Sequence, residues 1–283
     1  MDSPDQPVAA LFDRPAWRAH RDRAAANADF LHSEVAERLI DRLDLIDRDF
    51  TAILDLGARD GVLGRSLVAR NRDALVVSAE PSRKLLCKAP APRVCADPEL
   101  SPFGDASFDL VASSLALHWC ADLPGALIQL RRALKPDGLL LAALFAGSTL
   151  VELRTALFEA ELAEEGGVSP RISPTVELGD AAGLLQRAGF AMPVSDSETI
   201  TVTYPDMLAL MRDLRGMGET NALAARRRFL SRATLARAVA IYAERFSAPE
   251  GRITATFEVL FLTGWAPHPD HTTPRPGPRR KIP

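Results

Sequence analysis

Short apolar segments in the first half of the chain alternate with segments whose apolar residues recur every three or four positions. The helical spacing falls at 63–68 and 123–134. Apolar runs without alternation are typical of strands buried on both faces, and strands that alternate with helices indicate parallel pairing. The pattern therefore predicts an α/β fold with a doubly wound, mostly parallel sheet. The expected strands are 52–56, 74–79, 93–97, 108–113 and 139–145.

The second half of the chain has a mainly helical pattern. Helices are predicted at 150–165 and 178–188, followed by a strand of alternating polarity at 198–204. Residues 205–247 are predicted to be entirely helical, and an apolar strand at 253–262 completes the sheet. We interpret the helical insertion before this last strand as a lid or as a docking surface for a protein partner.

A single domain is expected between residues 12 and 266 of the 283-residue chain. Apolar residues at helical spacing over 12–50 predict helices ahead of the first strand. We expect both ends to be disordered, because residues 1–11 hold two prolines and residues 267–283 are rich in proline and basic side chains.

Four arginines lie close together near the start of the predicted N-terminal helices, at positions 14, 18, 21 and 23. One interpretation is a basic helix face in solvent, because charge runs are usually solvated. The other is a flap over a ligand cleft, or a docking patch for an anionic partner. The sequence leaves both open.

The turn after the first strand carries the candidate chemistry. Asp55 lies near the end of that strand, and Gly57 and Gly61 follow before the next helix. Glycine lets a ligand approach the backbone, and ligands of open parallel sheets bind beyond the carboxyl ends of the strands. A dinucleotide fingerprint fails here at Arg59 and Val62. The acid-x-G-x-G-x-G motif of S-adenosylmethionine-dependent methyltransferases fails only at Arg59, and a plain strand-to-helix turn is the alternative.

Two further acids follow the next two predicted strands. Glu80 is placed to accept hydrogen bonds from a ribose diol, and a strand-end cap is its alternative role. Asp97 is placed to accept a hydrogen bond from an adenine amine. Together with Asp55, they predict three carboxylates along one edge of the sheet. Such an edge suits a cationic nucleoside without phosphates and repels a pyrophosphate.

The chain as a whole resembles class I S-adenosylmethionine-dependent methyltransferases. The resemblance depends on 55–57, Glu80, Asp97, 101–109 and 130–138, which occur in the family's order and spacing. It implies a Rossmann-like, seven-stranded sheet with an antiparallel last strand, and S-adenosylmethionine as cofactor. The cofactor contacts that it implies are Asp55, Gly57, Ala58, Gly61, Glu80, Pro81, Asp97, Pro98, Ser114 and Leu115. Arg59 departs from the motif, and we expect its side chain to narrow the methionine end of the pocket or to reposition the sulfonium.

A narrower resemblance covers nearly everything from residue 12 to residue 267. The chain looks like the bacterial relatives of a mitochondrial complex I assembly factor that hydroxylates an arginine on a complex I subunit. It is more distantly similar to the malonyl-acyl-carrier-protein methyltransferase of biotin synthesis. The resemblance implies a protein substrate, such as a subunit of respiratory complex I. The segments that carry it are 12–14, 21–25, 117–119, 169–171, 217–223 and 264–268.

Two residues are candidates for work on the substrate. His118, just past the fourth strand, is placed to act as a general base, and lining the pocket wall is its alternative role. Arg171 lies in a loop between prolines and could pair with a carboxylate, although a surface arginine is the commoner outcome. His118 and Asp122 could share a helix face, but no third ligand for an iron site is apparent, so no metal is expected.

The composition of the chain indicates which partners, cysteine chemistry and cellular location to expect. A net charge of −3 and an aromatic content of 6% argue against a nucleic-acid partner. The three cysteines lack the spacing of a disulfide framework or a zinc site. No apolar run is long enough to span a membrane, so we expect a cytoplasmic protein, with peripheral membrane contact left open. The narrower resemblance implies that the protein is bacterial.

Three functions remain open from the sequence. The first is an enzyme that methylates or hydroxylates a protein side chain during complex I assembly. The second is a methyltransferase for a small molecule or a carrier thioester. The third is a non-catalytic assembly chaperone.

Overall fold

A mixed sheet of seven strands organises the structure, a computed structural model that describes residues 10–24, 29–225 and 229–268. The strand order is β3-β2-β1-β4-β5-β7-β6, and only β7 runs antiparallel to its neighbours. The predicted doubly wound sheet with an antiparallel last strand is therefore confirmed. The strands are β1 Ala52–Leu56, β2 Leu75–Ala79, β3 Arg93–Val94, β4 Phe108–Ser114, β5 Leu134–Phe145, β6 Ala191–Tyr204 and β7 Ile253–Trp265.

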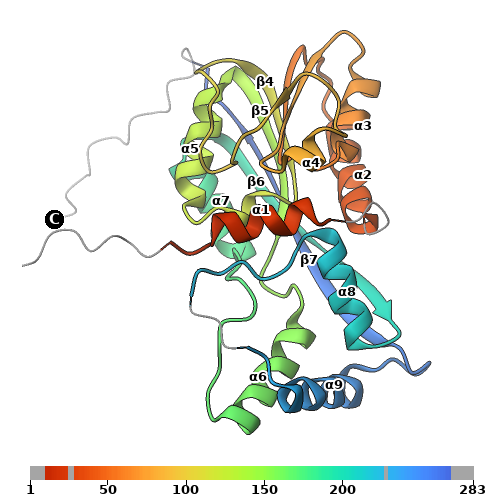
Figure 1. Cartoon of the computed structure of the whole chain (residues 1–283). Helices are drawn as coiled ribbons and strands as arrows, with labels where there is room; N and C mark the ends of the chain where they lie inside the picture. The colour runs from red at the N-terminus through yellow and green to blue at the C-terminus, as the bar shows by residue number, and fades with distance from the viewer. Residues whose placement is uncertain (1–9, 25–28, 226–228, 269–283) are drawn as a thin grey trace, which may run out of the picture.

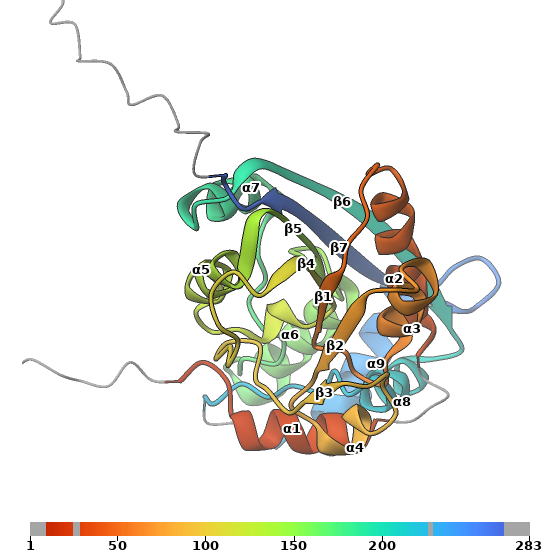
Figure 2. The ribbon, with the colours of Figure 1, turned by 90° about the horizontal axis from the view of Figure 1, so that it is seen from above.

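Helices cover both faces of the sheet (Figure 2). α2 and α3 lie on one face, and α5 and α7 lie on the other. α6, α8 and α9 form a lower lobe beside the extended ends of β6 and β7 (Figure 1). The helices are α1 Arg14–Asp22, α2 Phe30–Asp44, α3 Val62–Arg70, α4 Arg83–Leu86, the 3-10 helix η1 Leu117–Trp119, α5 Leu123–Ala133, α6 Val151–Glu165, α7 Leu178–Arg187, α8 Met207–Met217 and α9 Arg232–Phe246.

The core lies in two layers, one on each face of the sheet. In β1 the side chain of Ile53 packs in one layer, and those of Leu54 and Leu56 pack in the other. All three are fully buried or nearly so. Successive side chains of a strand point to opposite faces, so a strand that is apolar throughout is needed where both faces are covered. This arrangement leaves the carboxyl ends of the strands as the place where polar side chains can gather.

The structure differs from the predicted elements in the insertion. Residues 205–247 were expected to be one helical stretch, but α8 ends at Met217 and α9 begins only at Arg232. Gly218 ends α8 in the left-handed conformation, with φ of 85°. Ser231 caps α9, where its Oγ accepts from the N–H of Thr234. The described part of the segment between these two caps passes beside α1 instead of continuing the helix.

Two strands begin earlier than predicted. β5 starts at Leu134, which pairs with Phe108 of β4, and β6 starts at Ala191, which pairs with Trp265 of the 13-residue β7. Pairing with a neighbour extends a strand through residues whose own pattern is not strand-like. The predictions of disorder for 1–11 and 267–283 fall almost entirely outside the described residues. In the part of the chain that the structure describes, no helix is long and apolar enough to cross a membrane.

Candidate functional site

The turn from β1 into α3 is tightly packed at the point where the strand order reverses. The backbone N–H groups of Gly57 and Ala58 both donate to the carbonyl of Ala79, at 2.8 and 2.9 Å. Gly57 has φ of 72°, and a Cβ there would lie only 2.1 Å from the Cβ of Ala116. Only glycine fits both the conformation and the space. Gly61 begins α3 in the left-handed region as well.

Glu80, the candidate for binding a ribose, has a full set of donors within this chain. Arg21 donates to both of its oxygens, from Nε to Oε1 at 2.8 Å and from Nη2 to Oε2 at 2.6 Å. The backbone N–H groups of Arg59 and Ser82 add bonds of 3.0 and 2.9 Å. An ionised carboxylate has about four acceptor sites, so these donors fill it. A ribose hydroxyl can therefore bind Glu80 only if one of the donors leaves.

The Arg21–Glu80 pair is buried, with side chains 2% and 0% exposed. Burial alone lowers the pKa of Arg21, but the charge of Glu80 and the hydrogen bonds to it outweigh burial, so the pKa of Arg21 is raised. The interpretation of the four N-terminal arginines as one solvated face is thus wrong for Arg21. Arg18 and Arg23 are exposed, as that interpretation expects.

α1 lies as a flap across the carboxyl edge of the sheet, beside α4 in both views (Figures 1 and 2). Aromatic contacts hold it there, because Trp17 packs against Trp119 with ring centroids 5.8 Å apart. The N–H of Asp13 donates to the carbonyl of Ala222 at 2.7 Å. Arg14 donates to the carbonyl of Trp119 at 3.0 Å. The flap is therefore fixed both to η1, which follows β4, and to the segment after α8.

Asp55 and Ser114 present buried polar atoms with incomplete hydrogen bonding at the ends of neighbouring strands. Asp55 is 1% exposed, and its nearest donor is the backbone N–H of Gly64, whose contact falls outside ordinary hydrogen-bond geometry. Burial, with the nearby charge of Glu80, raises the pKa of Asp55 to about 7. The Oγ of Ser114 is without a partner. Buried polar groups without partners cost free energy, so these atoms fit a site that a polar ligand completes.

Asp97 does not end a strand, because β3 stops at Val94. The prediction of a third strand reaching Asp97 is wrong. Its Oδ1 accepts from the N–H of Glu99 at 3.0 Å and lies 3.6 Å from a nitrogen of Arg14. Burial raises the pKa of Asp97, and the charges of Arg14 and Arg18 act against this. The carboxylate thus lies next to the α1 flap. Pro81 and Pro98, which follow the two acids, are buried.

His118 forms a pair with Glu219, a residue that the sequence had not singled out. The Nε2 of His118 lies 3.1 Å from the Oε2 of Glu219, and the Nε1 of Trp119 donates to the same oxygen at 3.1 Å. Since a carboxylate only accepts, the proton between them belongs to Nε2, and Nδ1 remains as the basic nitrogen. The sequence allowed His118 and Asp122 to share a helix face. In the structure Asp122 instead caps α5.

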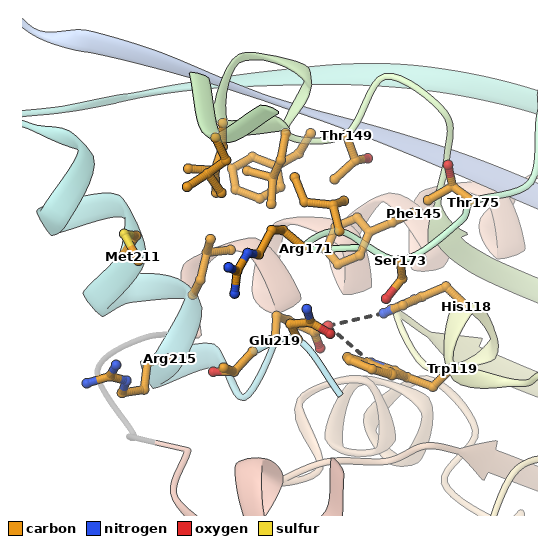
Figure 3. A pocket seen from close by; sticks show the side chains of 18 of the residues that line it. His118, Trp119, Phe145, Thr149, Arg171, Ser173, Thr175, Met211, Arg215 and Glu219 are labelled. Atoms are coloured by element: carbon orange, nitrogen blue, oxygen red, sulfur yellow. Dashed lines mark hydrogen bonds and ion pairs between the residues drawn. The ribbon is translucent and has the colours of Figure 1, made fainter. Parts of the chain in front are cut away.

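A cavity of about 690 Å³ opens beside this pair (Figure 3). Its walls are largely apolar and come from β5, β7 and the helices of the lower lobe, for example Phe145, Leu153, Met211 and Phe257. His118 and Glu219 lie together at one end. Cavities of this size and composition are typical of sites for small molecules or single side chains.

Arg171 lines the same cavity, but its guanidinium is engaged within the chain. Its Nε donates to the Oε1 of Glu161 at 2.7 Å, and Nη2 makes a second, short contact to the same atom. Glu161 is buried on α6 and also accepts from the N–H of Ser169. Arg171 thus ties its loop to α6. In the described ranges, no group of three or more histidine, cysteine, aspartate or glutamate side chains could hold a metal ion.

The sequence motifs did not identify two residues of the site, Arg21 and Glu219. Weaker features of the sequence indicate only part of their positions. Trp17 and Arg21 are four residues apart, so they share one face of α1. A tryptophan on that face indicates that it is not solvated. Glu219 follows a glycine directly after an amphipathic helix, which predicts a helix end but says nothing about what the next side chain contacts.

The strand order, the glycine corner after β1 and the acid after β2 together define a class I S-adenosylmethionine-dependent methyltransferase fold. The family of methyltransferase domains matches residues 54–142. Among solved structures, the YcgJ protein of Bacillus subtilis superposes with a TM-score of 0.57 at 14% identity. That match covers 81% of this chain and 98% of the other, and it supports the fold alone.

Two groups of relatives align over nearly the whole chain. The mitochondrial arginine-hydroxylase NDUFAF5 of Danio rerio is 41% identical, over 93% of this chain and 85% of its own length. The malonyl-[acyl-carrier protein] O-methyltransferase of a Methylovorus species is 36% identical, over 92% and 91%. The chain therefore belongs to the methyltransferase-fold family that includes the NDUFAF5 arginine hydroxylases and these malonyl-carrier methyltransferases.

Proposed function

We propose that this protein is an S-adenosylmethionine-binding enzyme that modifies a protein side chain, by methylation or by arginine hydroxylation, during assembly of respiratory complex I. The observation that carries the proposal is the 690 Å³ cavity with the His118–Glu219 pair at one end. The cavity lies next to the carboxyl edge of the sheet, and its apolar walls suit the stem of a long side chain. The relatives named arginine hydroxylases support a protein arginine as the acceptor.

The proposed cofactor site is the carboxyl edge under α1. The buried oxygens of Asp55 and Ser114, whose hydrogen bonding is incomplete, fit a polar nucleoside together with the glycine corner. Binding through Glu80 requires one of its four donors to leave, and we propose that this is an N–H group of the Arg21 side chain, because the other two donors belong to the backbone. When bound, S-adenosylmethionine supplies a sulfonium methyl group that a nucleophile can accept. The proposed contacts are Asp55, Gly57, Ala58, Gly61, Glu80, Pro81, Asp97, Pro98, Ser114 and Leu115.

His118 is the proposed base. In a methylation, its Nδ1 takes the proton that the acceptor nitrogen loses, while Glu219 holds Nε2 and orients the ring. In a hydroxylation, one oxygen atom of dioxygen enters a C–H bond, and a two-electron reductant from solution reduces the other oxygen to water. Arg171 is the proposed contact for the polypeptide around the acceptor, because it fixes the loop at the cavity wall.

Intact-mass analysis of the partner protein tests the proposal. A complex I subunit isolated from cells that carry the wild-type gene is expected to be heavier than the subunit from a deletion strain. A gain of one methylene indicates methylation, and a gain of one oxygen atom indicates hydroxylation. Equal masses in both strains, with normal assembly restored by a variant that no longer binds cofactor, would mean that the protein is a non-catalytic chaperone.

A carrier-thioester methyltransferase is the second candidate, because the malonyl-carrier enzymes align over nearly as much of the chain as the arginine hydroxylases do. The apolar cavity also accommodates an acyl chain. Purified protein incubated with a malonyl-loaded carrier and S-adenosylmethionine distinguishes the two functions. Transfer of a methyl group to the malonyl carboxylate would establish the second and displace the first.

A further inference from the structure

Glu219, at one end of the cavity, has one carboxylate oxygen that accepts hydrogen bonds and one that does not. Oε2 receives the hydrogen bonds from His118 and Trp119, whereas Oε1 is buried and has no partner. The side chain is 6% exposed. Its backbone is fixed as well, because the N–H of Glu219 donates to the carbonyl of Leu214 at 2.9 Å. The unused oxygen is therefore held in a defined position instead of being free to turn into solvent.

The charges around Glu219 leave room for one more cation. Arg21 and Arg59 lie near enough to interact with it, but each is bound to another carboxylate, Glu80 and Asp60 respectively. His118 contributes a positive charge only when it is protonated. A buried carboxylate oxygen that receives no hydrogen bond costs free energy, so a ligand N–H donor that carries a positive charge is stabilised at Oε1.

The arginines that line the cavity do not fill this role. Arg171 pairs with Glu161 on α6. Arg215 lies on α8 at the far side of the cavity, and its side chain points away from Glu219 (Figure 3). The cavity wall also includes the rings of Phe145 and Phe257, whose centroids are 6.0 Å apart, and the ring of Phe145 lies 4.8 Å from that of His118. Aromatic faces attract flat cations, and apolar walls pack well around an aliphatic stem.

We propose that the Oε1 atom of Glu219 is the binding point for the guanidinium group of the acceptor side chain. The inference deepens the proposed function and depends on it, because it assigns the residue that recognises arginine. A guanidinium carries several N–H donors in one plane and stacks on aromatic rings, so it fits this end of the cavity better than a compact ammonium. A charge-assisted bond to a buried carboxylate also discriminates against neutral side chains.

The test compares a cationic probe with its neutral isostere. N-acetyl-L-arginine amide and N-acetyl-L-citrulline amide are titrated by ligand-observed NMR into the full chain and into the Glu219→Gln variant. Glu244→Gln, which removes an exposed carboxylate on α9, is the matched control. The wild type and the control are expected to prefer the arginine probe by about tenfold or more, and Glu219→Gln is expected to lose this preference.

S-adenosylhomocysteine is titrated into the same three proteins, so that folding and cofactor binding are checked together. Its affinity is expected to be equal in all of them. If Glu219→Gln keeps the preference for arginine, the inference is wrong and the proposed function stands. If the variant loses S-adenosylhomocysteine and keeps the arginine probe, Glu219 serves the cofactor ammonium, which also overturns the inference. If the wild type shows no preference for arginine, the arginine acceptor itself is wrong.

Discussion

Replacing Arg21 with methionine is expected to lower the free energy of unfolding by about 3–5 kcal/mol, because it leaves a buried carboxylate without its cation. Arg21 and Glu80 are both almost fully buried and joined by two hydrogen bonds. Methionine matches the length of the aliphatic part of arginine but loses the guanidinium, which also lies over the ring of Trp17 at 5.5 Å, so the loss reports mainly on the charge. Urea denaturation followed by circular dichroism measures the change.

Arg18→Met is the matched control for this variant. Arg18 lies on the same helix but is exposed, so its replacement should change stability by no more than about 0.5 kcal/mol. Equal unfolding midpoints for the two variants would contradict the buried ion pair. Equal midpoints would also support the simpler interpretation that α1 is a basic helix in solvent.

The second large effect is the contribution of Asp55 to the free energy of unfolding, which we expect to depend on pH. The pKa of Asp55 rises from an ordinary 3.8 to about 7 in the folded chain, first because it is buried and then because of Glu80. Between these values the folded state binds more protons than the unfolded state. Asp55 therefore makes the free energy of unfolding fall as pH rises from about 4 to about 7, and its full cost of roughly 4 kcal/mol is present above pH 7.

Asp55→Asn removes this dependence. The variant should lose the downward slope between pH 4 and 7 and should be more stable than the wild type at pH 8. The expected gain is about 1–3 kcal/mol, because a buried amide has a desolvation cost of its own. Asp73→Asn, which removes an exposed carboxylate ahead of β2, controls for net charge. If the wild type and Asp55→Asn show parallel pH dependence, Asp55 does not titrate in this way.

A carboxylate that destabilises the fold at neutral pH indicates a function other than stability. Natural proteins retain such costs at sites where a ligand repays them. The glycine corner lies beside this carboxylate, where Gly57 holds a left-handed conformation directly against Ala116 and leaves the backbone accessible to a ligand. Both features lie at the end of β1, which is where we propose that the adenosyl group binds.

The sheet could be predicted from sequence because its parallel strands are buried on both faces. Ile53, Leu54 and Leu56 are apolar for that reason, and so the strand is visible without its neighbours. The start of β6 at Ala191 was missed because it depends on pairing with β7, which lies far away in the sequence. The break after Met217 was missed because helical spacing continues on both sides of Gly218.

Only those residues of the candidate site that lie at the end of a strand could be predicted from the sequence. Asp55, Gly57 and Glu80 lie at such ends, and the structure brings them together under α1. The partner of Glu80 could not be foreseen, because the face that α1 turns toward the sheet is set by its packing with Trp119 and residues 222–223. The contact between His118 and Glu219 joins residues 101 positions apart, which no local pattern reveals.

Calorimetric titration of the purified chain with S-adenosylmethionine and S-adenosylhomocysteine tests most directly whether the carboxyl edge of the sheet is an adenosyl site. Saturable binding of one molecule per chain is expected for both compounds. No binding is expected for NAD, because the carboxylates repel its pyrophosphate. If neither adenosyl compound binds to folded protein, or if NAD binds as well as they do, the central claim is contradicted.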